Sequence, residues 1–225
     1  MIRAGAEVLF YGLAAAASAL VLTATFVVIR SERPRTNGIA FLSGFLVGTV
    51  IACGVGLALG QAAVDRLDSH DTLKAALTLL LGIALLAVGL RARHTPPRPE
   101  GRGSRATAIL AGLGNMGPSA TFSMAGLLGF GGPKRLLLTF LAMASATEAG
   151  LRDIVNLTLV AVYVVISTLL VSVPVGIVII AGDRADMTFA RGQSWLTAHA
   201  GALRVWLSLG IGGALVVDAL LRLFA

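Results

Sequence analysis

The sequence predicts an all-α integral membrane protein in which six transmembrane helices form two inverted three-helix repeats. Hydrophobic residues make up 56% of the 225 residues and charged residues only 13%, whereas a soluble domain carries about 25% charged residues. The hydrophobic residues also form runs close to the length of about 20 residues that crosses a bilayer. Two of these runs, moreover, resemble one another in sequence. Together these features exclude a soluble enzyme, a disordered chain and a secreted disulfide scaffold.

The apolar runs define the predicted spans. Five of them are uninterrupted and occupy residues 8–29, 39–64, 73–90, 154–180 and 203–223. The fourth in chain order, 119–149, is interrupted, and we interpret it as a broken helix or as a re-entrant piece followed by a short helix. Glycine and proline weaken a helix interior, so breaks are predicted at Pro118, Gly131, Gly132 and Pro174.

The basic residues lie between the apolar runs, where they act as orientation signals. Of the 18 lysines and arginines, twelve fall on the inner face and five on the outer face when both termini are outside, with Arg204 at the border. If residues 106–132 formed one more complete crossing, this bias would be weaker. No basic stripe interleaved with aromatic residues is present, so nucleic acid is not an expected partner. The single Cys53 excludes an intrachain disulfide.

An internal repeat divides the chain. Residues 73–92 align with residues 203–222, with seven identical positions that include Gly82 and Gly212. We therefore predict a first repeat over 1–90, a basic cytoplasmic linker rich in proline and glycine over 91–118, and a second repeat over 119–225. An odd number of spans in each repeat inverts the second copy, as in many secondary transporters, whose substrate site lies near the midplane beside interrupted helices. The break from Gly131 to Arg135 is the candidate for that position, and the alternative is that its glycines only allow a close helix contact.

Three short motifs resemble a known family. Asn37-Gly-Ile-Ala-Phe-Leu-Ser-Gly44 follows an arginine-rich loop, Gly132-Pro-Lys-Arg precedes three leucines, and Pro174 is followed by a polar loop with Trp195-Leu196. These resemble the GAP family, the peptidoglycolipid or sulfolipid-1-addressing (Sap-like) proteins of actinobacteria within the LysE exporter superfamily. The resemblance implies export across the plasma (inner) membrane and movement of glycolipids toward the envelope.

Two positions depart from the family pattern. Gly132 replaces an asparagine, which removes a side-chain amide from the expected site. The first span reads Ser18-Ala-Leu-Val21 where the family carries prolines after the serine, so we predict an unbroken first helix.

The candidate substrate-binding residues follow the predicted break. A cation within a membrane protein is costly and usually faces a cavity, a partner or the interface, and the N–H groups of a restarting helix add positive potential. We therefore expect Pro133, Lys134 and Arg135 to bind the anionic group of a substrate. The alternative is that both cations reach the inner headgroups. Tyr163 and Ser167 are predicted to line the pathway, unless their hydroxyls only bond their own helix.

The candidate coupling or gating residues are three carboxylates. Glu148 and Asp153 lie where the fourth and fifth spans meet, and Asp218 lies inside the sixth span. Each carboxylate also has an alternative interpretation without a role in coupling. Glu148 and Asp153 would belong to a solvated turn with a local ion pair, and Asp218 would pair with Arg222. The acidic stretch 65–71 contains metal-ligand side chains, but a turn between helices needs the same residues. We expect no metal, no cofactor and no enzymatic activity. A phosphate-binding Walker motif is also missing, so ATP is not the direct energy source.

The sequence thus favours an exporter of an anionic glycolipid or lipid-linked cargo, in contact with membrane lipids. Export of a small solute, such as an amino acid or a cation, is the alternative within transport. A scaffold that docks lipid-synthesis or lipid-export machinery is an alternative of a different class, and a membrane enzyme is a third. The oligomeric state, homo-oligomers included, is left open.

Overall fold

The computed structural model describes residues 2–64, 112–148 and 153–181, together with scattered positions between 79 and 90 and between 205 and 220. The described part is helical, as the sequence predicts. In chain order, its helices are α1 (Ile2–Ala16), α2 (Ala19–Ile29), α3 (Pro34–Val64), α6 (Pro118–Phe130), α7 (Pro133–Glu148) and α8 (Asp153–Ala181).

Among the helices that the structure describes, two are long and apolar enough to cross a membrane unaided. These are α3, over Pro34–Ala58, and α8, over Ile154–Ile180. Two bent pairs, α1 with α2 and α6 with α7, each qualify if the pair counts as one span, so the described residues hold two to four candidate spans. The spans predicted over 73–90 and 203–223 lie largely outside the described residues. The prediction of six spans is therefore neither confirmed nor contradicted.

The prediction of an unbroken first helix is wrong. The run 8–29 divides into α1 and α2, whose axes differ by 59°. Ser18 has an extended backbone (φ −126°, ψ 109°) and is the N-cap of α2, its side chain accepting a hydrogen bond from the Val21 N–H at 3.5 Å. A serine N-cap can start a new helix without proline or glycine, because its hydroxyl replaces a missing backbone acceptor.

The two prolines predicted to break helices occupy different positions within their helices. Pro174 lies inside α8, which continues through it to Ala181, so the helix does not end there. Val171 and Val175 on either side are buried in the same apolar cluster, and this packing holds both turns in place. Pro118 begins α6 directly after the N-cap Gly117, a position where proline is favoured because its missing N–H would have no intrahelical partner.

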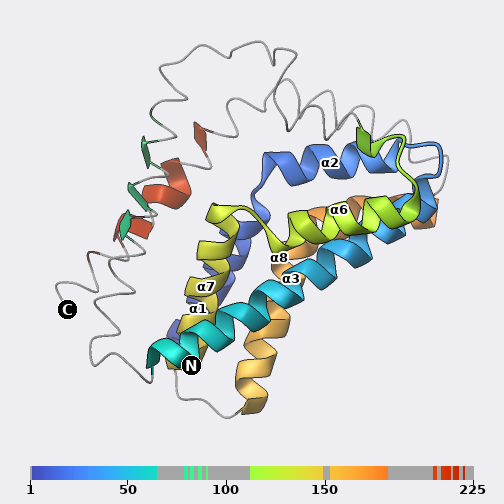
Figure 1. The fold of residues 1–225 in the computed structure, drawn as a ribbon. Helices are drawn as coiled ribbons and strands as arrows, with labels where there is room; N and C mark the ends of the chain where they lie inside the picture. The colour runs from blue at the N-terminus through green and yellow to red at the C-terminus, as the bar shows by residue number, and fades with distance from the viewer. Residues whose placement is uncertain are drawn as a thin grey trace.

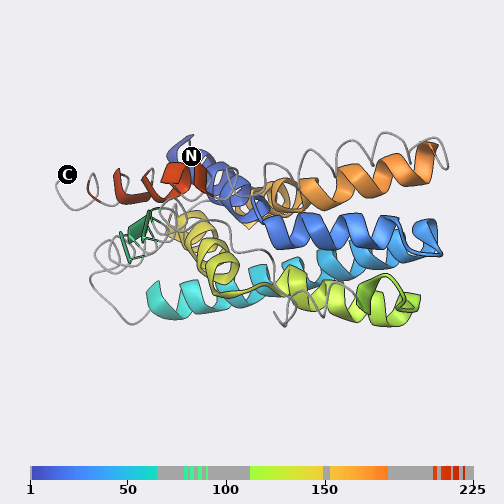
Figure 2. The same ribbon diagram turned by 90° about the horizontal axis from the view of Figure 1, so that it is seen from above.

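The bent pairs run alongside the unbroken helices. In Figures 1 and 2, α2 and α6 flank the first half of α3, α7 lies beside its second half, and α1 packs against α7 and α8. A Cβ at Gly44 or Gly48 would meet the backbone of α6 at Phe122 and at Gly126, and one at Gly56 would lie 3.0 Å from Met143 of α7. The pair α6–α7 therefore follows α3 in the same direction along the chain.

Helix α8 runs the opposite way to α3, parallel to α1–α2. Ile166 lies against Gly12 of α1, and Val175 lies further along α8 against Gly38 near the start of α3. Buried residues of α2 also pack against the second half of α8. The pair α1–α2 and helix α8 thus run in one direction, and α3 and the pair α6–α7 run in the other.

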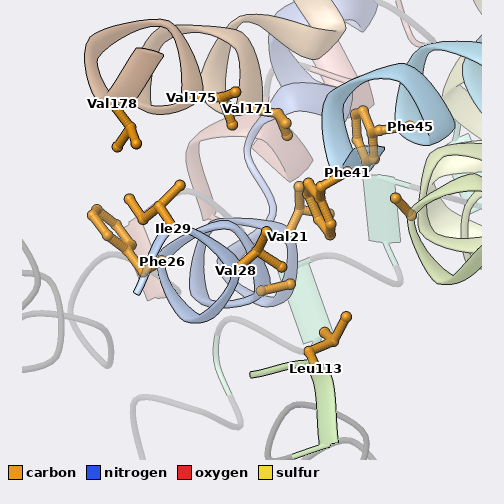
Figure 3. Close-up of a cluster of buried hydrophobic side chains, with 12 residues drawn as sticks. Val21, Phe26, Val28, Ile29, Phe41, Phe45, Leu113, Val171, Val175 and Val178 are labelled. Atoms are coloured by element: carbon orange, nitrogen blue, oxygen red, sulfur yellow. The ribbon is translucent and has the colours of Figure 1, made fainter. Parts of the chain in front are cut away.

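Two apolar clusters lie on either side of the helix breaks. One joins α2, the first half of α3 and the second half of α8, with Phe41, Phe45 and Val175 fully buried (Figure 3). The other joins α1, α7 and Tyr163 of α8, and also contains Cys53 and Leu215. The breaks, and the polar residues near them, lie between these two clusters.

Candidate functional site

The break between α6 and α7 is built by three consecutive residues. Gly131 has φ +101°, a backbone conformation that favours glycine, and its N–H still bonds the Leu127 carbonyl at 3.0 Å. Pro133 starts α7 without an N–H, so it cannot donate to the carbonyl of Gly129, four residues earlier. The two helix axes differ by 60°.

The side chain of Arg135 supplies the hydrogen bond that Pro133 cannot donate to the Gly129 carbonyl. Its Nε donates to the Gly129 oxygen at 3.2 Å and its Nη1 to the Ala15 oxygen of α1 at 3.3 Å. Its Nη2 donates to Thr49 Oγ1 of α3 at 3.2 Å and to the Ser167 carbonyl of α8 at 3.4 Å. Four of the five guanidinium N–H groups are thus bonded to groups of the protein, and the side chain is only 7% exposed.

The guanidinium also lies over an aromatic face. Its central carbon is 4.6 Å from the centroid of the Phe45 ring, a distance at which the ring quadrupole attracts a cation. All four hydrogen-bond acceptors around it are neutral oxygens. The charge is offset by these dipoles and by the partial negative charge at the C-terminal ends of α1 and α6.

Arg135 lies halfway along both unbroken helices. Its partner Thr49 is the central residue of α3, and its partner Ser167 is the central residue of α8. At 1.5 Å per residue each lies about 20 Å from either end of its helix. If α3 and α8 cross the bilayer, the guanidinium is therefore close to the midplane, where a charge costs most.

Lys134 lies beside the same breaks with a more open environment. Its Nζ donates to the Ala17 carbonyl at 3.4 Å, across from the start of α2, and its side chain is half-buried. An ammonium group carries three N–H donors. The first turns of α2 and α7 both begin next to it. Apart from the Val21 N–H, which bonds Ser18 Oγ, the N–H groups of these turns lack intrahelical acceptors. This is the part of the site suited to an anion.

Tyr163 and Ser167 lie next to this centre, and both side chains are buried in the interior of the protein. The Tyr163 hydroxyl is 2.7 Å from Thr139 Oγ1 and its side chain is fully buried. Ser167 contributes its carbonyl to Arg135, while its hydroxyl bonds the Val164 carbonyl of its own helix at 3.3 Å.

Two of the predicted coupling residues, Glu148 and Asp153, lie away from this centre. Glu148 is the last residue of α7 and Asp153 the first of α8, each about 20 Å along its helix from the level of Arg135. Asp218 and the acidic stretch 65–71 lie outside the described residues.

The Asn37–Gly44 motif has a structural role in this fold. Asn37 Nδ2 donates to Ser31 Oγ at 2.9 Å and to the Met116 carbonyl at 3.3 Å, joining the turn before α3 to the segment before α6. Gly44 permits backbone contact with α6 at Phe122. The motif thus fixes how α3 and α6 meet, and does not itself reach the basic centre.

Several residues of the centre escaped the sequence reasoning. Thr49, Phe45 and Thr139 contact Arg135 or Tyr163, and the carbonyls of Ala15 and Ala17 accept from the two cations. A backbone carbonyl leaves no signal in a sequence. The position of Thr49 in the middle of a predicted span was the one available indication.

Fold and site together define a helical membrane protein with a basic centre between two broken helices. The chain belongs to the family described as Sap, sulfolipid-1-addressing protein, whose sequence model it matches over residues 8–220. This confirms the Sap-like resemblance, and the family description indicates a role in lipid export or transport rather than in catalysis. No curated protein and no solved structure matches the chain.

Proposed function

We propose that the protein is an exporter of the plasma (inner) membrane that moves an anionic lipid outward, with Lys134 contacting the anionic headgroup. The observation that carries this proposal is the position of Lys134, half-buried beside the first turns of both α2 and α7. Two helix N-termini and an ammonium group together favour a sulfate, phosphate or carboxylate. The family description supports a sulfated lipid as the first cargo to test.

The two cations of the basic centre have different roles in this proposal. Four N–H groups of Arg135 are already bonded to the protein, whereas Lys134 has one hydrogen bond within the part of the chain that the structure describes, to the Ala17 carbonyl. An incoming anionic headgroup would therefore gain its charged hydrogen bonds from Lys134. Tyr163 and Ser167 support this centre from α8, and Glu148, Asp153 and Asp218 remain candidates for coupling or gating at the ends of the pathway.

The proposal can be tested with the purified protein in vesicles. NBD-labelled sulfatide and NBD-labelled galactosylceramide differ only in the sulfate, and dithionite quenching measures how fast each one reaches the outer leaflet. We expect the wild-type protein to accelerate the sulfated lipid selectively. Lys134→Gln should slow it about 10- to 100-fold, the loss of one charged hydrogen bond of about 1.5–3 kcal/mol.

Two control variants accompany this measurement. Lys134→Arg keeps the charge and should retain most of the transport. Arg35→Gln removes an exposed cation at the start of α3 and should behave as wild type. Equal acceleration of both lipids, or of neither, by the wild-type protein would overturn the proposal. No lipid movement by the purified protein is also what a scaffold for lipid-export machinery would give.

A further inference from the structure

One guanidinium joins two helix breaks that are far apart in the sequence. The last turns of α1 and α6 leave carbonyls without intrahelical donors, and Arg135 bonds one from each turn, Ala15 O and Gly129 O. Its remaining partners, Thr49 and Ser167, come from the two unbroken helices. A residue of α7 thereby contacts α1, α3, α6 and α8 at one level.

The shape of the side chain matters for these contacts. A guanidinium presents its N–H groups as a rigid planar fork, whereas an ammonium group concentrates its donors on one atom. The four bonds of Arg135 point to four different chain segments and are 3.2–3.4 Å long, at or just beyond the long end of the usual range. A lysine at this position would supply the charge without reaching all four acceptors.

The backbone around the break fits this side chain closely. A Cβ on Gly131 would lie 2.8 Å from both Cβ and Cδ of Arg135, whereas a Cβ on the neighbouring Gly132 would meet no atom within 4 Å. The side chain of Arg135 thus folds back over Gly131 toward the end of α6. The absence of a Cβ at Gly131 therefore leaves the space that the Arg135 side chain occupies.

We infer that Arg135 is a positioning residue that holds both breaks together, so that the first turns of α2 and α7 and the ammonium of Lys134 act on the same anionic group. The inference rests on the proposed function and goes beyond it, because it assigns to Arg135 a role that depends on its geometry and not on its charge. The anion itself is bound next to Lys134.

The test compares three proteins in lipid nanodiscs and in vesicles. Arg135→Lys keeps the charge, and the exchanged pair Lys134→Arg with Arg135→Lys keeps both cations but reverses their order. Amide hydrogen exchange is followed at Ala17 and Ser18 in the first break and at Gly131 in the second. Transport of NBD-labelled sulfatide gives the half-saturating concentration and the maximal rate separately.

We expect both variants to exchange at least tenfold faster at both breaks, although these lie more than 100 residues apart. The half-saturating concentration should rise at least tenfold, while the maximal rate stays within threefold of wild type. A fold that was merely damaged would lower the maximal rate through a smaller active fraction. Arg35→Gln should exchange at the wild-type rate at every one of these amides.

The outcomes separate this inference from the proposed function. Wild-type exchange at Ala17 and Ser18 in Arg135→Lys would overturn the inference, and so would near-wild-type transport by the exchanged pair. If the wild-type protein moves no lipid but both breaks loosen together, the proposed function fails and the joining of the breaks stands. If the arginine variants do not fold, Thr49→Val removes one acceptor and should give a smaller rise in exchange at both breaks. Unchanged exchange in that variant would contradict the inference.

Discussion

Two buried threonines show how much a single hydroxyl contributes at the basic centre. Thr25 and Thr49 are both fully buried, and each bonds a carbonyl four residues earlier in its own helix at 2.8 Å. Thr49 Oγ1 additionally accepts from Arg135 at 3.2 Å and lies 3.4 Å from the Gly129 carbonyl. A threonine side chain therefore makes only a local hydrogen bond at position 25 in α2, whereas at position 49 in α3 it connects α3 with α6 and α7.

This difference predicts unequal costs for the same substitution. Thr49→Val should lower the free energy of unfolding by about 1–3 kcal/mol, because it leaves a buried guanidinium N–H without its acceptor. Thr25→Val should cost less than about 1 kcal/mol, since only a bond within its own helix is lost. Reversible unfolding in mixed detergent micelles measures both. Equal costs for the two variants would show that the Arg135 contact adds nothing to stability.

At the scale of the helix, α3 and α6 approach until their backbones touch. A Cβ on Gly44 or Gly48 of α3 would run into the Phe122 or Gly126 carbonyl, and one on Gly129 of α6 would run into the Phe45 carbonyl. Small residues allow such close packing between membrane helices, where apolar burial provides little driving force. Close packing therefore explains Gly129 near the break, which is the alternative that the sequence had left open for the glycines of this region.

The crossing predicts a clear contrast between two alanine substitutions in one helix. Gly44→Ala should destabilise the protein by about 1–3 kcal/mol or more, because the added methyl meets backbone that cannot move aside cheaply. Gly54→Ala should be neutral or slightly stabilising, since no atom lies within 4 Å of its Cβ and alanine favours the helix. Detergent unfolding of both variants tests this. A destabilised Gly54→Ala with an unaffected Gly44→Ala would contradict the described crossing.

The two helix breaks differ in how far the sequence reveals them. The break after Phe130 is encoded locally, by a glycine at positive φ and a proline that withholds an N–H. The break after Ala16 has neither residue, and it depends on Ser18 and on carbonyl contacts with Lys134 and Arg135, more than 100 residues away. Pro174 is the opposite case, because packing on both sides outweighs its local effect. Local pattern predicts structure only where long-range contacts do not oppose it.

At the scale of the whole molecule, the direction of the helices constrains the topology. Helices α3 and α6–α7 run the same way, as the order of their contacts from Gly44 to Gly56 indicates. A chain that ends one crossing and begins a parallel one must cross back an odd number of times between them. The predicted span 73–90 supplies one such crossing. A Cβ on Gly82 would lie 3.1 Å from the Gly212 carbonyl, so equivalent positions of the predicted repeats are in contact, and the inversion of the repeats stays a prediction.

The topology predicts on which side of the membrane two loops lie. With Cys53 replaced by alanine, Ser69→Cys in the acidic stretch should react with a membrane-impermeant maleimide added outside intact cells. Ser104→Cys in the basic linker should react only after the membrane is opened, because basic loops stay in the cytoplasm. The two cysteines are separated by the predicted span 73–90, so their opposite accessibility measures that crossing directly. Labelling of both from the same side would require an even number of crossings between α3 and α6. That result would be incompatible with parallel helices that both cross the bilayer, and the inverted-repeat plan would fail with it.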